Sequence, residues 1–175
     1  MTAMERATAP SSLGHGAAAN EAAASRAAAA AMLYSRAMTR VAQLELQSRY
    51  DTIELAERML AEVCRSCEVG DEAVYWSGMA LREALANAIK HGNKLSPDKR
   101  VFVRIEVNGD DELRIAVEDQ GEGFDPRQVA NPLDPQNLLR ESGRGIFLMR
   151  TLMDRVEFTT TQSGTQVRLW LNLSP

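Results

Sequence analysis

The spacing of apolar residues changes along the chain from a helical period to a strand period. Over 50–67 and 71–91, apolar residues recur at steps of three and four, which predicts two amphipathic helices. Over 101–107, every second residue is aliphatic, which predicts a half-buried strand. A short apolar run over 41–46 predicts another strand ahead of the first helix.

The second half of the chain continues as short segments separated by turn signals. Asn-Gly-Asp-Asp at 108–111 predicts a hairpin. Residues 121–142 are rich in Gly, Pro, Asp and Asn and predict a long loop, whereas the apolar run over 146–153 predicts a short helix. Helices in the first half and neighbouring strands in the second predict the α+β class, as a two-layer sandwich with a mixed sheet and helices on one face. The remaining strands are expected over 113–117, 156–161 and 165–173.

The N-terminal part of the chain differs from the rest. Residues 17–31 are nearly all alanine, so they have helical propensity but no large apolar stripe to bury. Residues 1–39 are therefore predicted to be a disordered or loosely helical tail, and the folded domain is expected over 40–175. The tail lacks the apolar centre of a secretory signal and only faintly resembles an organelle transit peptide.

Composition narrows the class of protein. A chain of 175 residues is long enough for one domain with a sizeable core. The net charge of -4 gives no overall basic footprint, so nucleic acid is not a favoured partner. The longest apolar stretch, 27–33, is far shorter than the roughly 20 residues of a membrane span. No membrane association is expected.

Cys64 and Cys67 are the only two cysteines, and they form the sequence CRSC. They fit a redox pair, half of a zinc site, or two ordinary thiols on a helix. A structural zinc site needs about four ligands, and the chain adds only His15 and His91 as histidines. So sparse a use of cysteine fits a reducing compartment, and a cytoplasmic location is expected.

A first candidate site lies in EALANAIKHGNK, residues 83–94. Glu83, Asn87 and His91 are four residues apart, and residues at that spacing share one face of an α-helix. Asn87 offers a neutral oxygen ligand suited to Mg²⁺, and Glu83 could take a proton from a hydroxyl group. A solvated helix face would give the same pattern, so the stripe alone leaves both interpretations open.

A second candidate lies in VEDQGEGF, residues 117–124, where a predicted strand ends at Asp119. A carboxylate fixed at a strand end could accept a hydrogen bond from an exocyclic amine, such as that of adenine. Gly121 and Gly123 allow close approaches that larger residues forbid. A plain glycine turn after a strand is the alternative.

A third candidate lies in SGRGIFLM, residues 142–149, where Gly-Arg-Gly leads into an apolar helix. Backbone N–H groups at a helix N-terminus bind phosphate, and the helix dipole favours the negative charge. The alternative here is a glycine turn that only begins the helix. The long polar loop before this motif has the length of a lid.

Taken in this order, the three motifs resemble the N, G1 and G2 boxes of the GHKL ATPase superfamily, which contains gyrase and the sensor histidine kinases. The chain is most similar to the bacterial anti-sigma factor serine/threonine kinases of that superfamily. LREALANAIKHGN, SGRGIFLMRTLMD and the compact size carry this likeness, which covers about residues 40–173. The resemblance implies a Bergerat-type ATP-binding fold.

The resemblance also assigns roles to the first two motifs. Asn87 would hold the Mg²⁺ ion that bridges the ATP phosphates, and Glu83 would be the catalytic base. Asp119 would accept a hydrogen bond from the adenine amino group. Gly121 and Gly123 would shape the wall of the pocket.

Further roles follow for the end of the chain. Gly143, Arg144 and Gly145 would lie against the phosphates beneath the lid. Thr165 matches a family threonine that supports the adenine contact. Lys90 lies near the first motif and could touch a phosphate or be solvated.

The activity implied is that of an ATP-dependent serine/threonine kinase. It would bind Mg-ATP, sequester a sigma factor and phosphorylate a STAS-type anti-sigma factor antagonist, and a homodimer is a candidate assembly. A non-catalytic ATP-binding module that only sequesters a partner is the alternative. The catalytic half of a histidine kinase is disfavoured, because His15 lies between two glycines and His91 belongs to the first motif.

Overall fold

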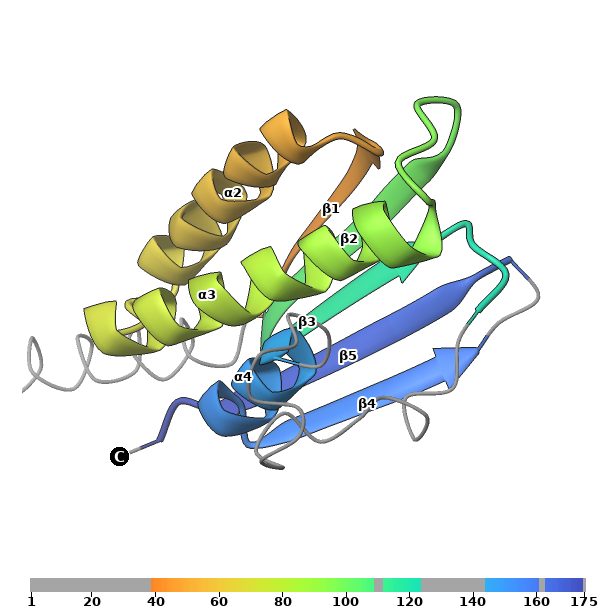
Figure 1. Ribbon diagram of the computed structural model, residues 1–175. Coiled ribbons are helices and arrows are strands. Elements are labelled where there is room, and N and C mark those ends of the chain that lie inside the picture. Colours follow the sequence, from red (N-terminus) through yellow and green to blue (C-terminus); the bar gives the residue numbers. More distant parts are fainter. Residues whose placement is uncertain (1–38, 109–111, 124–143, 161–162, 175) are drawn as a thin grey trace, which may run out of the picture. The chain divides into compact units, whose positions relative to one another are not determined.

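The computed structural model describes residues 39–108, 112–123, 144–160 and 163–174. In these residues, helices and strands form two layers (Figure 1). Two short segments, a 3₁₀ turn at Tyr50–Thr52 and a π-helical turn η2 at Ala88–Gly92, adjoin the longer helices. The longer elements are β1 (Arg40–Gln47), α2 (Ile53–Ser66), α3 (Asp71–Asn87), β2 (Arg100–Asn108), β3 (Glu112–Asp119), α4 (Arg144–Leu152), β4 (Arg155–Thr160) and β5 (Thr165–Asn172).

The five strands form one sheet in the order β1-β2-β3-β5-β4. The α+β class, the two layers and the helices on one face are confirmed. The expectation of a mixed sheet was wrong, because every strand pair among the described residues is antiparallel. β2 with β3 and β4 with β5 are consecutive antiparallel pairs, and β5 runs beside β3 in the opposite direction, so no parallel neighbours arise.

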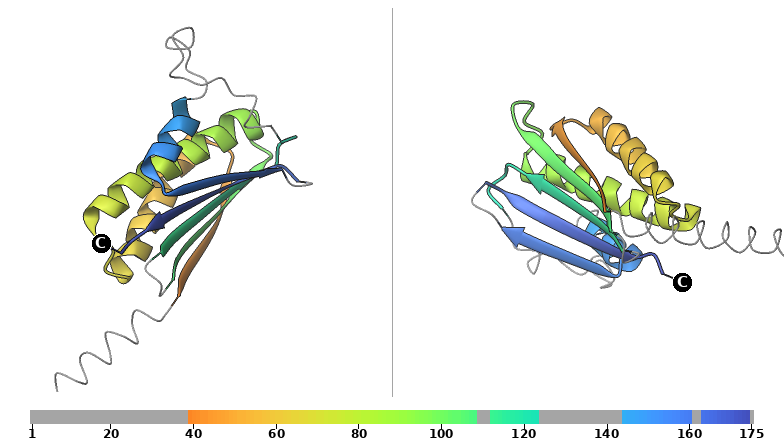
Figure 2. Two further views of the ribbon diagram at one scale, coloured as in Figure 1. Left: turned by 90° about the horizontal axis from the view of Figure 1, so that it is seen from below. Right: turned by 180° about the vertical axis from the view of Figure 1, so that it is seen from behind.

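The core lies between the sheet and the three helices, which Figure 2 shows together on one side of the sheet. Along β2 the side chains alternate between buried and more exposed, as the period-two pattern predicted. The helices turn their apolar stripes toward the same layer, because that burial is the main source of their stability. The largest side chains in this layer are Leu60, Leu81, Leu85, Ile89, Ile105, Leu113, Ile115, Met149 and Leu169, all under 2% exposed.

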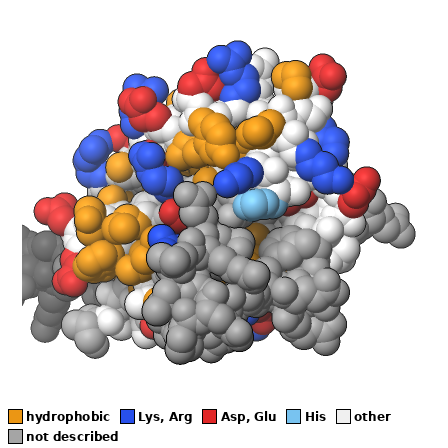
Figure 3. Space-filling model, in the orientation of Figure 1, with side chains coloured by type: hydrophobic (Ala, Val, Ile, Leu, Met, Phe, Trp, Pro, Cys, Tyr) orange, Lys and Arg blue, Asp and Glu red, His pale blue; other side chains and the backbone are white. Residues whose placement is uncertain are grey.

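The helical face also carries apolar side chains that remain in contact with solvent (Figure 3). Leu55 on α2 and Phe147 on α4 are among them, and Tyr75 packs edge-on against Trp76 at the start of α3. Within the described ranges, no helix combines the length and apolar character needed to cross a bilayer.

The two cysteines lie at the end of α2, and both thiols are free. Burial raises the pKa of the Cys64 thiol to about 12, and Cys67 is partly exposed. A thiol with so high a pKa is a poor nucleophile and a poor metal ligand. The predictions for residues 1–38 and for most of the long loop (124–142) lie outside the described residues.

Candidate functional site

The first motif occupies the end of α3 and the π-helical turn that follows it. Glu83 and Asn87 lie on the last turns of α3 and are half-buried. The α-helix was predicted to continue to His91, but η2 replaces its last turn, and the Asn93 N–H donates to the Ala88 carbonyl at 2.7 Å. Because a π turn widens the helix, His91 is not in the α-helical register of the stripe. The His91 side chain is mostly exposed. The part of it that is buried and the nearby charge of Lys90 both lower its pKa.

Asp119 ends β3 in the second motif, and its side chain is fixed by two backbone groups. The N–H of Gly121 donates to its Oδ1 at 2.8 Å, and the N–H of Thr165 donates to the same oxygen at 3.2 Å. Among the described residues, its Oδ2 accepts no hydrogen bond. Burial raises the pKa of Asp119, and the two N–H groups partly oppose this shift. The carboxylate is therefore held in one orientation and is largely removed from water.

Glycines surround Asp119 because nothing larger fits there. An added Cβ at Gly92 would lie 2.6 Å from Asp119 Oδ1 and would overlap its Cγ. A Cβ at Gly164 would overlap the carbonyl of Asp119, and one at Gly121 would lie 2.9 Å from Asp119 Oδ1. Sequence reasoning found Gly121 but missed Gly92 and Gly164. The available signal was that each adjoins a residue already singled out, His91 or Thr165.

Thr165 adds a buried hydroxyl group beside Asp119. It begins β5 and is 2% exposed, and its Oγ1 has no hydrogen-bond partner in the described part of the chain. A buried hydroxyl without a partner is costly, so this position suits a polar ligand or a water. Gly123 lies farther along, with φ +79°, where an added Cβ would lie 2.6 Å from Thr160 Cγ2.

The third motif lies against the first. Gly145 is in the first turn of α4, and an added Cβ there would lie 2.6 Å from Glu83 Oε2 and 3.3 Å from Asn87 Nδ2. The Nδ2 atom of Asn87 is buried and has no hydrogen-bond partner among the described residues. Arg144 is exposed at the start of the helix, and Gly143 lies outside the described residues.

The predicted site residues thus form two groups. Asp119, Gly121 and Thr165 are in direct contact at one end, and Glu83, Asn87 and Gly145 meet at the other. The end of α3 connects the two groups, since Asn87 precedes η2 and Gly92 closes it. Lys90 is exposed, and among the described residues no hydrogen bond or ion pair joins it to either group.

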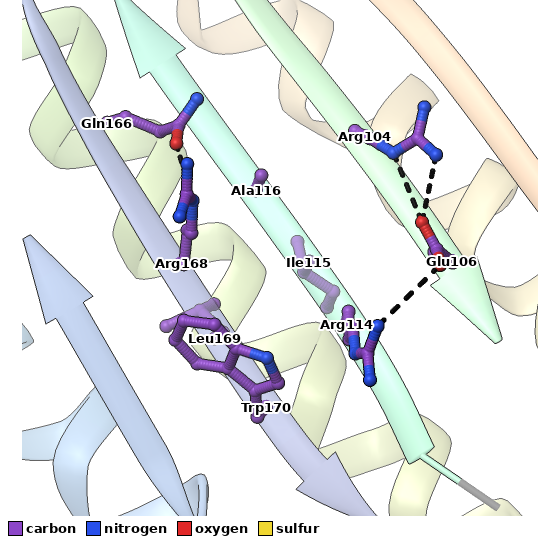
Figure 4. A pocket seen from close by; sticks show the side chains of 9 residues that line it. All are labelled: Arg104, Glu106, Arg114, Ile115, Ala116, Gln166, Arg168, Leu169 and Trp170. Carbon is purple, nitrogen blue, oxygen red and sulfur yellow. Dashed lines mark hydrogen bonds and ion pairs between the residues drawn. The ribbon is translucent and has the colours of Figure 1, made fainter. Parts of the chain in front are cut away.

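A separate hollow of about 360 Å³ lies on the sheet, among strands β2, β3 and β5 (Figure 4). Three arginine side chains contribute to its lining, and Arg104 and Arg114 both pair with Glu106. None of the predicted site residues lines this hollow, so it is distinct from the two groups above. Its lining consists of Arg104, Glu106, Arg114, Ile115, Ala116, Gln166, Arg168, Leu169 and Trp170.

Comparison with known proteins gives a matching family and several named relatives. The family described as "Histidine kinase-like ATPase domain" matches residues 46–171. The serine-protein kinase RsbW of Staphylococcus epidermidis is 30% identical over 120 residues, which cover 65% of this chain and 76% of that protein. The anti-sigma F factor of Heyndrickxia coagulans is 36% identical over 97 residues, which cover 53% of this chain and 65% of that protein.

A solved structure has a similar fold. The RsbU and RsbW domains of a Mycobacterium tuberculosis protein match with a TM-score of 0.58 and 17% identity, over 78% of this chain and 33% of that one. At this identity the likeness concerns the fold alone. The family match covers most of the chain and includes both groups of site residues. The chain therefore belongs to the histidine kinase-like ATPase domain family.

Proposed function

We propose that this protein is an anti-sigma factor kinase that transfers the γ-phosphoryl group of ATP to a serine or threonine of an antagonist protein and also sequesters a sigma factor. The observation that carries the proposal is the contact of Gly145 with Glu83 and Asn87. It places a helix N-terminus, which suits a phosphate group, beside a carboxylate and an amide. Relatives named serine-protein kinase and anti-sigma F factor support the same activity.

The base would bind at the Asp119 end of the site. Its Oδ1 is occupied by two backbone N–H groups, which leaves Oδ2 to accept from the adenine amino group. The unpartnered Oγ1 of Thr165 is buried beside it and offers a further polar contact. Because the carboxylate is buried, a hydrogen bond to it discriminates well between a donor and an acceptor on the base.

The phosphates would extend toward α4 and the end of α3. Gly145 leaves room next to Glu83, and the first N–H groups of α4 would face the phosphate oxygens together with Arg144 and Gly143. Glu83 would take the proton from the attacking hydroxyl group. Lys90 is a candidate phosphate contact only if its exposed side chain turns toward the site.

The residues around Asn87 suit Mg²⁺ better than a metal ion that requires several side-chain ligands. Among the described residues there is no group of three or more His, Cys, Asp or Glu side chains that could hold a metal ion. Mg²⁺ commonly takes few protein ligands together with waters and phosphate oxygens. The Oδ1 atom of Asn87 would supply one such ligand, and its Nδ2, which is buried without a partner among the described residues, would be left to donate to a phosphate oxygen. When bound, Mg²⁺ would neutralise phosphate charge.

The two partners are a sigma factor and a STAS-type antagonist whose hydroxyl group accepts the phosphate. A homodimer is part of the same proposal. The name anti-sigma F factor supports a sigma factor as partner, and the name serine-protein kinase supports a protein substrate that carries a serine hydroxyl group.

The test is phosphate transfer from γ-labelled ATP to antagonist proteins encoded in the same genome, beside capture of sigma factors with and without ATP. We expect Mg²⁺-dependent label on one antagonist, and we expect Asn87→Ala to lose the Mg²⁺-dependent part of ATP affinity. A wild-type protein that binds ATP and a sigma factor but labels no antagonist would favour a non-catalytic sequestering module. Unchanged Mg²⁺ dependence in Asn87→Ala would contradict the metal assignment.

A further inference from the structure

Asn93 is a fully buried polar residue just beyond the first motif. It is 0% exposed, although it follows Gly92 at the start of a connecting segment. Sequence reasoning treats it only as a helix stop. A buried amide is costly unless its donors and acceptor are paired, so the partners of Asn93 indicate what it does.

The Asn93 side chain closes a ring of three hydrogen bonds. Its Nδ2 donates to the Arg100 carbonyl at 2.9 Å, and its Oδ1 accepts from the Gln120 N–H at 2.8 Å. The third bond runs from the Arg100 N–H to Gln120 Oε1 at 2.7 Å. The ring ties together the segment after η2, the first residue of β2 and the residue that follows β3.

This ring lies one residue from Asp119. Gln120 shares a peptide bond with Asp119, so fixing the Gln120 N–H fixes the plane from which the carboxylate projects. On the other side, Gly121 donates to Asp119 Oδ1, and Gly92 lies against the carboxylate. Both residues that follow Asp119 are therefore held, and Asn93 holds the first of them.

The backbone around Asn93 indicates that the position is constrained. Lys94 and Leu95 follow it in the left-handed region, with φ +55° and +59°, although neither is a glycine. Such conformations persist where surrounding contacts determine them. The Lys94 ammonium also pairs with Glu122 at 3.0 Å, which joins the same two segments a second time.

We propose that Asn93 is a positioning residue for base recognition, which holds the Asp119–Gln120 peptide so that the carboxylate faces the base. This inference rests on the proposed function, in which Asp119 reads the adenine amino group. Asn93 does not touch the base. It acts through the peptide bond between Asp119 and Gln120, so its loss is expected to affect the discrimination between bases more than the affinity for phosphates.

The experiment compares the dissociation constants of ATP and inosine triphosphate, which carries a carbonyl oxygen in place of the amino group. The wild type is expected to prefer ATP by about ten- to hundredfold, the range for a hydrogen bond to a charged group. Asn93→Leu removes both side-chain hydrogen bonds and keeps the branching and the number of heavy atoms of the side chain. We expect this variant to lose most of the preference, through weaker ATP binding with little change for the inosine nucleotide.

Two further variants keep the test decisive. Gln120→Ala opens the ring at an exposed side chain, so it is expected to fold and to reduce the preference about two- to tenfold, as for one neutral hydrogen bond. Ser77→Ala is the matched control, because Ser77 is also 0% exposed but bonds only to helix carbonyls in α3. It is expected to leave the ratio unchanged.

The outcomes separate the two claims. A wild type that binds both nucleotides equally would overturn the role of Asp119 and with it this inference. A wild type that prefers ATP, with the preference intact in Gln120→Ala and in any folded Asn93→Leu, would overturn the role of Asn93 alone. Equal losses for both nucleotides in Asn93→Leu would indicate a merely structural role and would also contradict it.

Discussion

The two ends of the site are built differently. At the end proposed to bind adenine (the adenine end), Asp119 is held by backbone N–H groups and enclosed by glycines, so its orientation is set before any ligand binds. At the end proposed to bind the phosphates (the phosphate end), Glu83 and Asn87 lie on a helix surface, and the Asn87 Nδ2 has no hydrogen-bond partner among the described residues. One end is organised by buried backbone contacts, and the other by side chains that approach a second helix.

This difference indicates that base recognition and phosphoryl transfer would depend on different ends of the site. A base is recognised by a fixed carboxylate, because a hydrogen bond in a desolvated site is strong only when the geometry is already set. Phosphoryl transfer instead depends on positioning and on the stabilisation of negative charge on the phosphoryl group as it passes from ATP to the acceptor. Changes at the adenine end are therefore expected to alter ATP affinity, and changes at the phosphate end to alter the rate of transfer.

The largest expected effect is on catalysis at the phosphate end. Glu83→Gln is nearly isosteric, so α3 and the neighbouring Asn87 should keep their places. It removes the base, which contributes typically 10²–10⁴-fold. We expect transfer to the antagonist to fall by about that factor while ATP affinity changes less than about twofold. Radiolabel transfer and calorimetry on the same preparation measure both.

A control for this variant is Glu62→Gln, which changes an exposed carboxylate on α2 that pairs with Arg65. It should transfer phosphate at the wild-type rate. Transfer at the wild-type rate by Glu83→Gln would show that Glu83 is not the catalytic base. It would also contradict the expectation that changes at the phosphate end alter the rate of transfer.

The second effect is on binding at the adenine end. Gly92→Ala would drive a methyl group into the Asp119 carboxylate, which the N–H groups of Gly121 and Thr165 hold in place. We expect ATP affinity to fall about a hundredfold, and the free energy of unfolding to fall by about 1–3 kcal/mol, as for overpacking. Gly78→Ala on α3 is the control, because an added Cβ there meets nothing within 4 Å.

The variants Gly92→Ala and Gly78→Ala together test whether crowding at Asp119 is the cause of the lost affinity. Gly78→Ala is expected to raise the free energy of unfolding by up to about 1 kcal/mol, since alanine is the better helix former. Equal ATP affinity in the two alanine variants would show that Asp119 has freedom to move, against the description of a fixed adenine end.

Most of the fold could be predicted from the sequence, because helix and strand periods are local. The strand predicted over 101–107 and the helix over 146–153 match β2 and α4 within two residues. Six of the predicted site residues lie in two groups, Asp119, Gly121 and Thr165 in one and Glu83, Asn87 and Gly145 in the other, whereas Lys90 lies outside both. What the sequence does not display is contact between distant segments: Gly92, Asp119 and Gly164 meet only through the pairing of β3 with β5 and the turn of η2.

The same reason explains three details that were wrong or missing. The mixed sheet was expected because strand direction is not encoded in a period of two, and β5 reaches its place beside β3 through a connection that includes α4. The π turn at 88–92 has no local signal, since its residues fit an α-helix equally well. Asn93 was read as a helix stop because its partners, Arg100 and Gln120, are fixed only in the folded chain.

The third prediction concerns the charge on Asp119. Asp119→Asn keeps an oxygen for the Gly121 and Thr165 N–H groups but presents an amide NH₂ to the base. We expect ATP to bind about ten- to hundredfold more weakly, with a smaller change for inosine triphosphate. Equal losses for the two nucleotides, measured by calorimetry, would speak against base reading by this carboxylate.

The contribution of Asp119 to the free energy of unfolding depends on pH in a definite direction. Burial raises the pKa of Asp119 above the ordinary value of about 3.9. The folded protein then binds this proton more tightly than the unfolded chain does, so the stability contributed by protonated Asp119 is lost as pH rises from 3.9 through the raised pKa. Asp119→Asn should flatten this part of the stability curve and should not lower the free energy of unfolding at pH 7. Chemical denaturation from pH 3 to 8 tests this.

The smallest expected effect is on stability at the phosphate end. An alanine at 145 would approach Glu83 Oε2 and Asn87 Nδ2, which are the ends of side chains rather than backbone. A half-buried Glu83 can rotate away, whereas Asp119 at the other end cannot. We therefore expect Gly145→Ala to change the free energy of unfolding of the nucleotide-free protein by less than about 1 kcal/mol, with the gain from helix propensity offsetting the crowding. Thermal unfolding compared with Gly92→Ala measures the contrast.

The rate of phosphoryl transfer in Gly145→Ala should fall more than the ATP affinity, because the carboxylate of Glu83, the proposed catalytic base, is displaced by a distance that matters for proton transfer. A loss of stability as large as that of Gly92→Ala would mean that the two ends are equally rigid.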